Sequence, residues 1–471
     1  MSIALILDCG ATNVRAIAVE SSGHIVASHH ISNETVQTGN EHVWNFDDIW
    51  NKLVQCVGNV TAQLPDMKRA DISAIAVTTF GVDGAPFNKD GQQIYPIISW
   101  KCSRTIAVMA QVEAEMDRQK LYLENGVGDY SFNTLYKLRW LKEHEPEVYQ
   151  QMDKFVFISS MINHRLTGKL TTDRTMAGTS MLTNLQTGEW NTEALDYLGL
   201  TEDHFPPMVD AGEVIGTVSH EMAKLFDVPD RTAVISAGHD TQFALFGSGV
   251  EENQPFLSSG TWEILMARAN NMTLNPSYLA DGLTTELDAK RGLYNPAVQW
   301  LSSAVMEWVS STYFPDLQQQ PNKYSQMIKE GSAVPAGCNG VKFIPSFQPK
   351  KDDVTGGHIS GLSINTTRGE IYRSALEGLA SKLKESLATL SEVGKFQVDS
   401  LVVVGGGSRN SLWNQIRADV LEVPILVVDE PECTVMGAAM YALAGAGVYK
   451  SADEAQKAMK PSFTTVTPRQ G

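Results

Sequence analysis

Short apolar runs separated by polar, glycine-containing turns open the chain. Residues 3–7 form one such run, which breaks at the polar segment 8–13 and resumes over 14–19, where apolar residues flank a single arginine. Two strands joined by a short turn are the simplest interpretation of this pattern. We therefore predict that the chain begins with a strand, a polar turn and a second strand.

A boundary between two domains is expected near residue 232. Two apolar runs around a polar turn return over 233–247, just after the proline-containing stretch 228–230. At roughly 100 to 200 residues per domain, the length of the chain calls for more than one domain. We predict an N-terminal domain of residues 1–232 and a C-terminal domain of residues 233–471, of similar size and related plan.

Strand-like and helix-like patterns alternate along the rest of the chain. Four further β-branched runs are typical of buried strands, at 72–78, 155–158, 401–404 and 425–428. Over 370–393, leucines recur at steps of three and four, which predicts an amphipathic helix packed against a core. This alternation predicts a mixed α/β fold.

Composition and charge narrow the class of protein. The chain has 37 Lys and Arg against 54 Asp and Glu, a formal net charge of −17, which argues against nucleic acid or an anionic membrane as partner. With 43% hydrophobic and 19% charged residues, it has the composition of a folded globular protein. The longest uncharged apolar run, 433–449, is shorter than the roughly 20 residues of a membrane span and is expected to be a packed helix.

The cysteines and the N-terminal segment indicate the compartment. Five widely spaced cysteines without a C-x-x-C pair predict neither a disulfide framework nor a structural zinc site. No basic residue precedes Asp8, so the first residues resemble a strand rather than a secretory signal. We expect a reducing, cytoplasmic setting. The sequence leaves open whether the chain forms a homo-oligomer.

Four turns rich in small residues are candidates for anion binding. The chain has no P-loop, no dinucleotide-binding fingerprint, no H-E-x-x-H and no G-x-S-x-G motif. The remaining turns lie at residues 8–13, 236–241, 258–261 and 405–410. Gly, Ser and Thr let backbone amides approach a phosphate closely, although each turn alone is more typical of an ordinary structural turn.

Two of these turns carry an aspartate just past an apolar run, Asp8 and Asp240. A phosphoryl-transfer site needs a divalent cation, amides around the phosphates and an acceptor for the hydroxyl proton. Mg²⁺ prefers oxygen ligands and commonly bridges a carboxylate to substrate phosphates. On residue type alone, a turn-forming aspartate that caps the next element is the alternative for Asp240, and an ordinary tight turn is the alternative for Asp83.

Several segments resemble a known family. Residues 8–15 resemble the first phosphate motif of the actin-like ATPase and sugar-kinase superfamily, and residues 238–241 resemble its second. Residues 357–362, followed by 370–377, resemble the signature of the FGGY carbohydrate kinases, and 405–410 is similar to their adenosine-binding loop. The resemblance runs in order from residue 3 to about residue 450 and so covers nearly the whole chain.

The resemblance implies an ATP-dependent sugar kinase of the α/β class, with two ribonuclease-H-like domains and an active-site cleft between them. Residues 78–85, 95–102 and 258–266 resemble members of the family that phosphorylate the 1-hydroxyl of 6-deoxy ketoses. Two such ketoses, which differ only in stereochemistry, stay open as substrates. A nucleotide-dependent sensor on the same scaffold is the alternative from another class.

The resemblance also implies roles for individual residues, with ATP as co-substrate and Mg²⁺ as cofactor. Asp240 is expected to be the general base for the sugar hydroxyl, and Asp8 is expected to hold Mg²⁺. The residues expected around ATP are Thr12, Asn13, Arg15, Gly260, Thr261, Gln299, Gly405, Gly406 and Asn410. The residues expected to bind the sugar are Asp83, Arg104, Asn133, His239 and Trp262. For His239 and Trp262 a purely structural role stays open.

Overall fold

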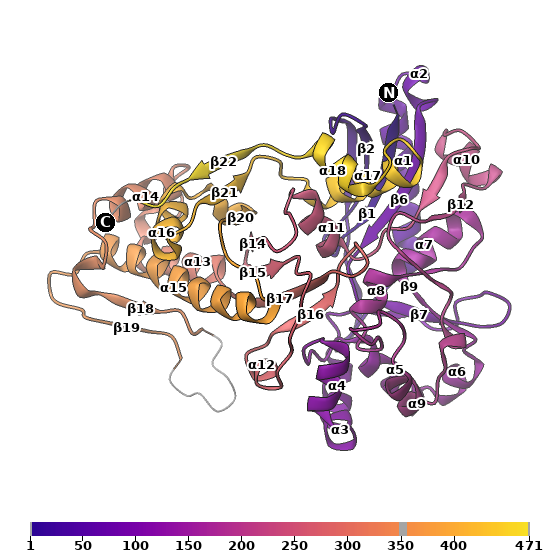
Figure 1. The fold of residues 1–471 in the computed structure, drawn as a ribbon, viewed down its shortest axis with the longest axis horizontal. Helices are drawn as coiled ribbons and strands as arrows, with labels where there is room; N and C mark the ends of the chain where they lie inside the picture. The colour runs from indigo at the N-terminus through magenta and orange to yellow at the C-terminus, as the bar shows by residue number, and fades with distance from the viewer. Residues whose placement is uncertain (1, 348–355, 470–471) are drawn as a thin grey trace. The chain divides into compact units, whose positions relative to one another are not determined.

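The computed structural model describes residues 2–347 and 356–469, which fall into two units. The first unit comprises Met1–Gly249, Leu274–Asn295 and Glu432–Pro461, and the second comprises Val250–Thr273, Pro296–Pro431 and Ser462–Gly471. In Figure 1 the C-terminal helices α17 (Cys433–Gly445) and α18 (Ala452–Met459), in yellow, lie beside the N-terminal strands in indigo. The first unit is therefore assembled from segments that are far apart in the sequence.

A six-stranded sheet in the order β12-β13-β6-β1-β2-β3 forms the centre of the first unit. Its strands are β1 (Ile3–Cys9), β2 (Asn13–Glu20), β3 (Ile25–Ser32), β6 (Ile72–Thr79), β12 (Val214–Thr217) and β13 (Ala233–Ile235). The predicted opening hairpin is confirmed, since β1 runs antiparallel to β2 with Asp8 opposite Arg15. β1 also runs parallel to β6, which places Thr78 next to Asp8. The register thus gathers three polar side chains at one end of the sheet.

Both faces of this sheet are covered by helices. Leu5 and Leu7 of β1 belong to a core shared with α1 (Phe46–Gln63) and α7 (Ile158–Thr167). Ala4 and Ile6, which point the other way, belong to a core shared with α11 (Asp240–Gly247) and α17. Burial on both faces explains why β1 is a continuous apolar run instead of an alternating one.

We predicted that the strand–turn–strand pattern returns over 233–247. The second strand of this prediction, at 243–247, is wrong, because these residues belong to helix α11. β13 pairs in parallel with β6, and parallel neighbours are joined by crossovers, not hairpins. α11 crosses α17 with backbone in contact, since a Cβ on Gly247 would lie 1.9 Å from the Cys433 carbonyl oxygen. The predicted boundary at residue 232 falls between β12 and β13, inside the first unit.

Smaller elements complete the first unit. The strands are β4 (Val36–Thr38), β5 (Glu41–Trp44), β7 (Gly84–Phe87), β8 (Ile97–Ile98), β9 (Lys154–Phe157), β10 (Thr172–Asp173), β11 (Met208–Val209) and β16 (Thr284–Leu287). The helices are α2 (Asp66–Arg69), α3 (Ile106–Glu115), α4 (Arg118–Asn125), α5 (Thr134–His144), α6 (Pro146–Gln151), α8 (Arg174–Gly178), α9 (Thr192–Leu198), α10 (His220–Phe226) and α12 (Ser277–Ala280).

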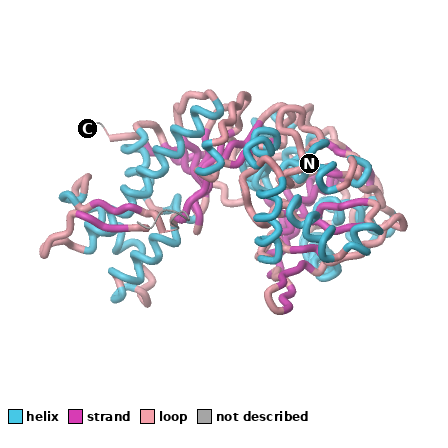
Figure 2. Tube along the Cα trace, turned by 90° about the horizontal axis from the view of Figure 1, so that it is seen from below, coloured by secondary structure: helices cyan, strands magenta, loops and turns pink. Residues whose placement is uncertain are grey.

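The second unit is also α/β, as the alternation of cyan helices and magenta strands in Figure 2 shows. Its sheet contains the order β17-β15-β14-β20-β21-β22. The strands are β14 (Pro255–Ser259), β15 (Trp262–Ala267), β17 (Tyr294–Leu301), β20 (Leu401–Val404), β21 (Ile425–Val428) and β22 (Phe463–Val466); a short pair is formed by β18 (Lys342–Ile344) and β19 (His358–Ser360). The helices are α13 (Ser303–Tyr313), α14 (Lys323–Ser332), α15 (Arg368–Gly394) and α16 (Ser411–Leu421).

The long helix predicted over 370–393 is confirmed as α15. It begins at a capping box in which Thr367 and Glu370 each accept a backbone N–H of the other. Its leucines at 376, 379, 383, 387 and 390 are buried. Over the described ranges 2–347 and 356–469, no helix combines the length and apolar character that crossing a membrane requires.

Candidate active site

Asp8 is held in one orientation at the end of β1. Its Oδ2 accepts a hydrogen bond from Arg15 Nε at 2.8 Å, and its Oδ1 accepts one from Thr78 Oγ1 at 3.1 Å. Arg15 in turn donates from Nη1 to Glu432 Oε2 at 2.6 Å. Although burial opposes the guanidinium charge, Asp8 and Glu432 raise the pKa of Arg15. The pair therefore presents a fixed carboxylate whose partner stays charged.

The turn between β1 and β2 presents its two predicted ATP-binding side chains to solvent. Thr12 and Asn13 are exposed, while Gly10 N donates to Asn13 O at 2.9 Å within the turn. Asn33 supports the turn from β3, since its backbone N–H donates to Thr12 O at 2.7 Å and its Nδ2 to Gly10 O at 2.9 Å. The turn thus has a fixed backbone with exposed hydroxyl and amide groups.

Asp240 begins helix α11 immediately after the turn that follows β13. Its side chain is 31% exposed and is therefore accessible to a ligand. Its Oδ1 accepts a hydrogen bond from Thr241 Oγ1 at 3.1 Å and lies 3.4 Å from His239 Nε2. The other ring nitrogen of His239 lies 3.3 Å from Glu286 Oε2. The imidazole thus sits between two carboxylates.

The electrostatics of this cluster favour a charged histidine. Burial lowers the pKa of His239, but Glu286 and Asp240 outweigh it, so the net shift is upward. Burial opposes ionisation of Glu286, but His239 lowers its pKa overall. For Asp240, partial burial and the nearby charge of Asp8 raise the pKa against the lowering effect of His239. Asp8 pairs with Thr78 on β6, and the next residue, Thr79, pairs with His239, so the fold brings the two predicted aspartates near each other.

A buried carboxylate supports the turn that carries His239 and Asp240. Asp173 accepts hydrogen bonds from Ser236 Oγ at 2.6 Å and from the Thr175 backbone N–H at 2.9 Å. Thr175 Oγ1 then accepts the backbone N–H of His239 at 2.9 Å. Gly238 lies so close that a Cβ there would be 2.4 Å from Asp173 Oδ1. Only glycine fits at this position without displacing the supporting carboxylate.

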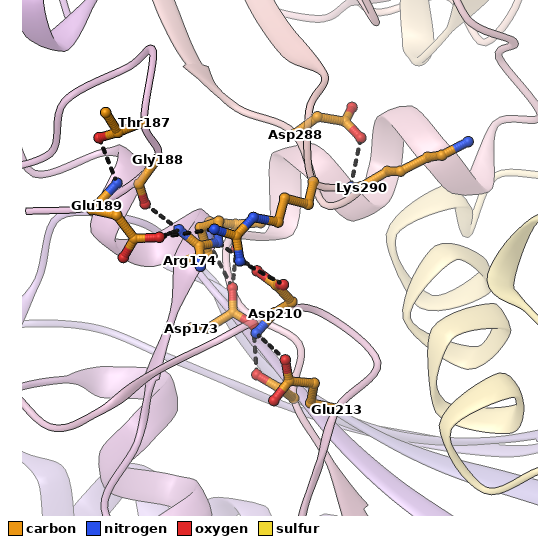
Figure 3. A network of polar contacts seen from close by, with 12 residues as sticks. Asp173, Arg174, Thr187, Gly188, Glu189, Asp210, Glu213, Asp288 and Lys290 are labelled. Carbon is orange, nitrogen blue, oxygen red and sulfur yellow. Dashed lines mark hydrogen bonds and ion pairs between the residues drawn. The ribbon is translucent and has the colours of Figure 1, made fainter.

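Figure 3 shows the polar network that continues outward from Asp173. Arg174 hydrogen bonds to Asp210 and to the Gly188 carbonyl oxygen. The segment after Asp210 returns to the turn, since Gly212 N donates to Ser236 O and Ser236 N donates to Glu213 O, both at 2.8 Å. Three chain segments therefore hold the backbone that precedes the predicted base.

Asp83 is fully buried and its carboxylate is saturated by donors. Its Oδ2 accepts from Trp44 Nε1 at 2.7 Å and from the Trp100 backbone N–H at 3.1 Å, and Lys137 Nζ binds its Oδ1. Burial raises the pKa of Asp83 in spite of these partners. Val82, beside it, has φ 61, an unusual conformation for a β-branched residue. Asp83 is thus a buried carboxylate directly after a residue with strained backbone, Val82.

Arg104 and Asn133 are both engaged inside the first unit. Arg104 donates from Nε to Cys102 Sγ at 3.1 Å and from Nη1 to the Tyr95 hydroxyl at 3.2 Å. Asn133 is 1% exposed and donates from Nδ2 to Gly128 O at 2.9 Å. A role of either residue in binding the sugar stays a prediction.

The remaining predicted ATP and sugar residues lie in the second unit. Thr261, Trp262 and Gln299 are exposed near the ends of β15 and β17, and Gly260 lies in the turn before β15. Asn410 caps α16 by accepting Trp413 N at 3.1 Å. These residues lie at or near two turns of one sheet. Because the strands that carry them are neighbours in that sheet, the residues lie near one another.

The glycine-rich turn after β20 lies directly on Ser259. Gly405 has φ 91, and a Cβ there would be 2.6 Å from Ser259 O, whereas nothing lies within 4 Å of a Cβ on Gly406. Ser259 Oγ donates to Glu263 at 3.0 Å and accepts from Arg417 Nη2 at 2.8 Å. A buried ion pair of Glu263 and Arg417 thus supports this turn from below.

Several of these residues carried no signal in the sequence. Glu286, Glu432, Asp173 and Lys137 are isolated polar residues in segments without a glycine-rich motif. The structure alone brings Glu286 to His239 and Lys137 to Asp83. Asp173 differs slightly, because a buried strand-end aspartate followed by Thr175 is typical of a local turn.

The donor set suits Mg²⁺ better than a metal that needs an all-protein site. Within the part of the chain that the structure describes, no group of three or more His, Cys, Asp or Glu side chains is arranged to hold a metal ion. Mg²⁺ usually keeps several waters and is bound by one or two carboxylates together with substrate phosphates. Asp8 offers one such carboxylate, and its charge also acts on Asp240.

Two family models divide the chain between residues 247 and 256, whereas the first unit also includes the later segments 274–295 and 432–461. The family model for the N-terminal domain of the FGGY family of carbohydrate kinases matches residues 3–247, and that for the C-terminal domain matches residues 256–446. The chain is 52% identical to L-fuculokinase of Haemophilus influenzae, over 99% of this chain and 100% of that protein. It is 29% identical to rhamnulokinase of Pectobacterium atrosepticum, over 84% and 78% of the two chains.

A solved structure gives the fold independently of these sequences. The crystal structure of xylulose kinase from Rhodospirillum rubrum matches with a TM-score of 0.89 and 23% identity, covering 99% of this chain and 94% of that one. The predicted α/β fold class is confirmed by this likeness.

Proposed function

Because the chain belongs to the FGGY family of carbohydrate kinases, we propose that it transfers the γ-phosphoryl group of ATP to the 1-hydroxyl of L-fuculose. The products are L-fuculose 1-phosphate and ADP. The observation that carries the proposal is Asp240, an accessible carboxylate that begins a helix beside His239 and near Asp8. The identity to an L-fuculokinase far exceeds the identity to a rhamnulokinase, which supports the choice of sugar.

In this proposal Asp240 accepts the proton of the sugar hydroxyl as that oxygen attacks the γ-phosphorus. Burial and the charge of Asp8 raise the pKa of Asp240, and the nearby His239 opposes that rise. A carboxylate is a weak base, so its contribution comes mainly from orienting the hydroxyl. Removing it is expected to slow the reaction by about 10² to 10⁴.

Asp8 would hold Mg²⁺, with Arg15 and Thr78 keeping its carboxylate in place. Bound Mg²⁺ would neutralise charge on the β- and γ-phosphates. Thr12, Asn13 and the turn of Gly405 and Gly406 are assigned to ATP, together with Arg15, Gly260, Thr261, Gln299 and Asn410. Gly406 in particular leaves open space above its Cα for a ligand.

Sugar binding is assigned to the neighbourhood of Asp83, Asn133 and Trp262, with Arg104 and His239 acting through other residues. The saturated carboxylate of Asp83 would act by fixing Val82 and the Trp100 backbone instead of accepting a sugar hydroxyl. We further propose a cytoplasmic location, since ATP is available there and the five buried free cysteines would stay reduced.

A coupled assay of ADP release over a panel of ketoses tests the proposal. We expect turnover of L-fuculose to exceed that of L-rhamnulose and D-xylulose by tenfold or more in kcat/KM. Faster turnover of L-rhamnulose would favour a rhamnulokinase. Nucleotide binding without sugar-stimulated ADP release would instead favour a nucleotide-dependent sensor.

A further inference from the structure

Glu286 reaches the predicted base from a segment that returns to the first unit late in the chain. Its strand, β16, is fixed by Thr285 N, which donates to Gly126 O at 2.7 Å, and by Thr284 Oγ1, which accepts Gly128 N at 3.1 Å. The Glu286 side chain is 17% exposed. The strand therefore delivers one carboxylate to a defined place beside His239.

The imidazole of His239 is confined on several sides. One ring nitrogen lies 3.3 Å from Glu286 and the other 3.4 Å from Asp240. Behind the ring is Gly81, where a Cβ would lie 3.1 Å from His239 Nε2. The ring thus has room for one orientation, in which it links the two carboxylates.

The groups around the imidazole are carboxylates and side chains that hold them in place. Gln242, fully buried on α11, donates from Nε2 to Glu286 Oε2 at 2.6 Å, which fixes that carboxylate further. The charged neighbours are Glu286 from β16 and Asp240 from α11, and the charge of Asp8 acts on Asp240 from β1. Asp173 supports the His239 backbone through Thr175 from the other side.

We propose that Glu286 is a positioning residue for phosphoryl transfer, which holds the His239 imidazole against Asp240 so that the base keeps one direction. The proposal rests on the proposed role of Asp240 as base. In this proposal Glu286 acts through His239 and does not touch the reacting atoms. A carboxylate that orients a functional histidine commonly contributes 10- to 100-fold to activity where the histidine binds a metal, and we expect about tenfold or more here.

Steady-state kinetics of Glu286→Gln test this role by the ADP-release assay between pH 5.5 and 9. We expect kcat to fall about tenfold or more while KM for the sugar changes less than about threefold. Without the Glu286 charge, His239 loses its proton at lower pH. The alkaline limb of the pH profile of kcat/KM should therefore move to lower pH, which narrows the profile.

A double-mutant cycle separates positioning from general structural support. In a His239→Gln background, Glu286→Gln should change kcat by less than about twofold, because its effect passes through His239. Glu20→Gln is the matched control: Glu20 is 12% exposed and paired with Lys68, but lies at the opposite end of β2 from Arg15. We expect this control to keep wild-type kcat and pH profile.

Three results would overturn the proposal: an unchanged kcat in Glu286→Gln, a pH profile of unchanged width, or equal losses in both backgrounds of the cycle. Should far-UV circular dichroism show that Glu286→Gln does not fold, Glu286→Asp carries the test. It keeps the charge, so its profile should keep the wild-type width, and a narrowed profile refutes the role. Full activity in Asp240→Asn refutes the proposed function itself, whereas an inactive Asp240→Asn beside a wild-type-like Glu286→Gln refutes only Glu286.

Discussion

Replacing Lys137 by methionine removes one member of a buried ion pair in the proposed sugar-binding region. Lys137 and Asp83 are 2% and 0% exposed. Lys137 Nζ also donates to the Val82 carbonyl oxygen at 3.2 Å, so it holds the residue with φ 61. Methionine keeps most of the side-chain volume but leaves the Asp83 carboxylate without a cation.

The structure sets the expected loss of stability. Removing one partner of a buried pair commonly costs about 3 to 5 kcal/mol, because the other charge stays buried. The Asp83 carboxylate would still accept from Trp44 Nε1 at 2.7 Å and from Trp100 N at 3.1 Å. These two donors place the expected loss at the lower end, about 3 kcal/mol at pH 7.5.

The loss should depend on pH with a definite sign. Burial already raises the pKa of Asp83, and removal of Lys137 raises it further. An acid with a raised folded-state pKa binds its proton more readily when folded, so lowering the pH favours the folded state of the variant. The free-energy deficit of Lys137→Met relative to wild type should therefore shrink between pH 7.5 and pH 5.

Urea unfolding followed by far-UV circular dichroism measures both effects. Lys52→Met is the matched control, because Lys52 pairs with Asp48 at 2.6 Å but Asp48 is 50% exposed. Such a pair contributes at most about 1 kcal/mol. A Lys137→Met protein within 1 kcal/mol of wild type at pH 7.5, or with a deficit that grows as the pH falls, would refute this reasoning.

Three further predictions concern the reaction. Asp240→Asn should lower kcat by about 10² to 10⁴ while ATP binding measured by calorimetry stays within threefold, and a larger loss of binding would contradict a role in chemistry. Gly407→Ala should raise KM for ATP at least tenfold with KM for the sugar unchanged, because its Cβ would lie 2.1 Å from Ser259 Oγ. Asp8→Asn should raise the Mg²⁺ concentration for half-maximal rate about tenfold, and an unchanged Mg²⁺ titration would exclude Asp8 as the metal-holding residue.

Local patterns in the sequence were sufficient to predict the strands and helices that are buried. The runs at 3–7, 72–78, 401–404 and 425–428 correspond to β1, β6, β20 and β21, since burial on both faces requires continuous apolar residues. The prediction of a strand at 243–247 was wrong, because an apolar run of that length is compatible with strand or helix. The parallel pairing of β13 with β6 decided between them.

Candidate site residues that lie within a single turn could also be predicted from the sequence. Asp8 lies at the end of β1 and Asp240 follows β13, and their turns carry the glycines that permit close approach, so residue type and spacing were enough to single them out. Asp83 was singled out as well, as a candidate to bind sugar hydroxyls, and that role stays a prediction. Its burial depends on Trp44 and Lys137, which come from other elements.

The sequence by itself thus determined which turns are candidates for phosphate binding and which carboxylates lie in them, because a strand and the turn after it consist of consecutive residues. Only the tertiary structure decided which side chains surround those carboxylates. Glu432 reaches Arg15 across 417 positions, and Glu286 reaches His239 from a strand that rejoins the first unit after the chain has left it. Such contacts depend on the pairing and packing of distant segments, which no local pattern of residues records.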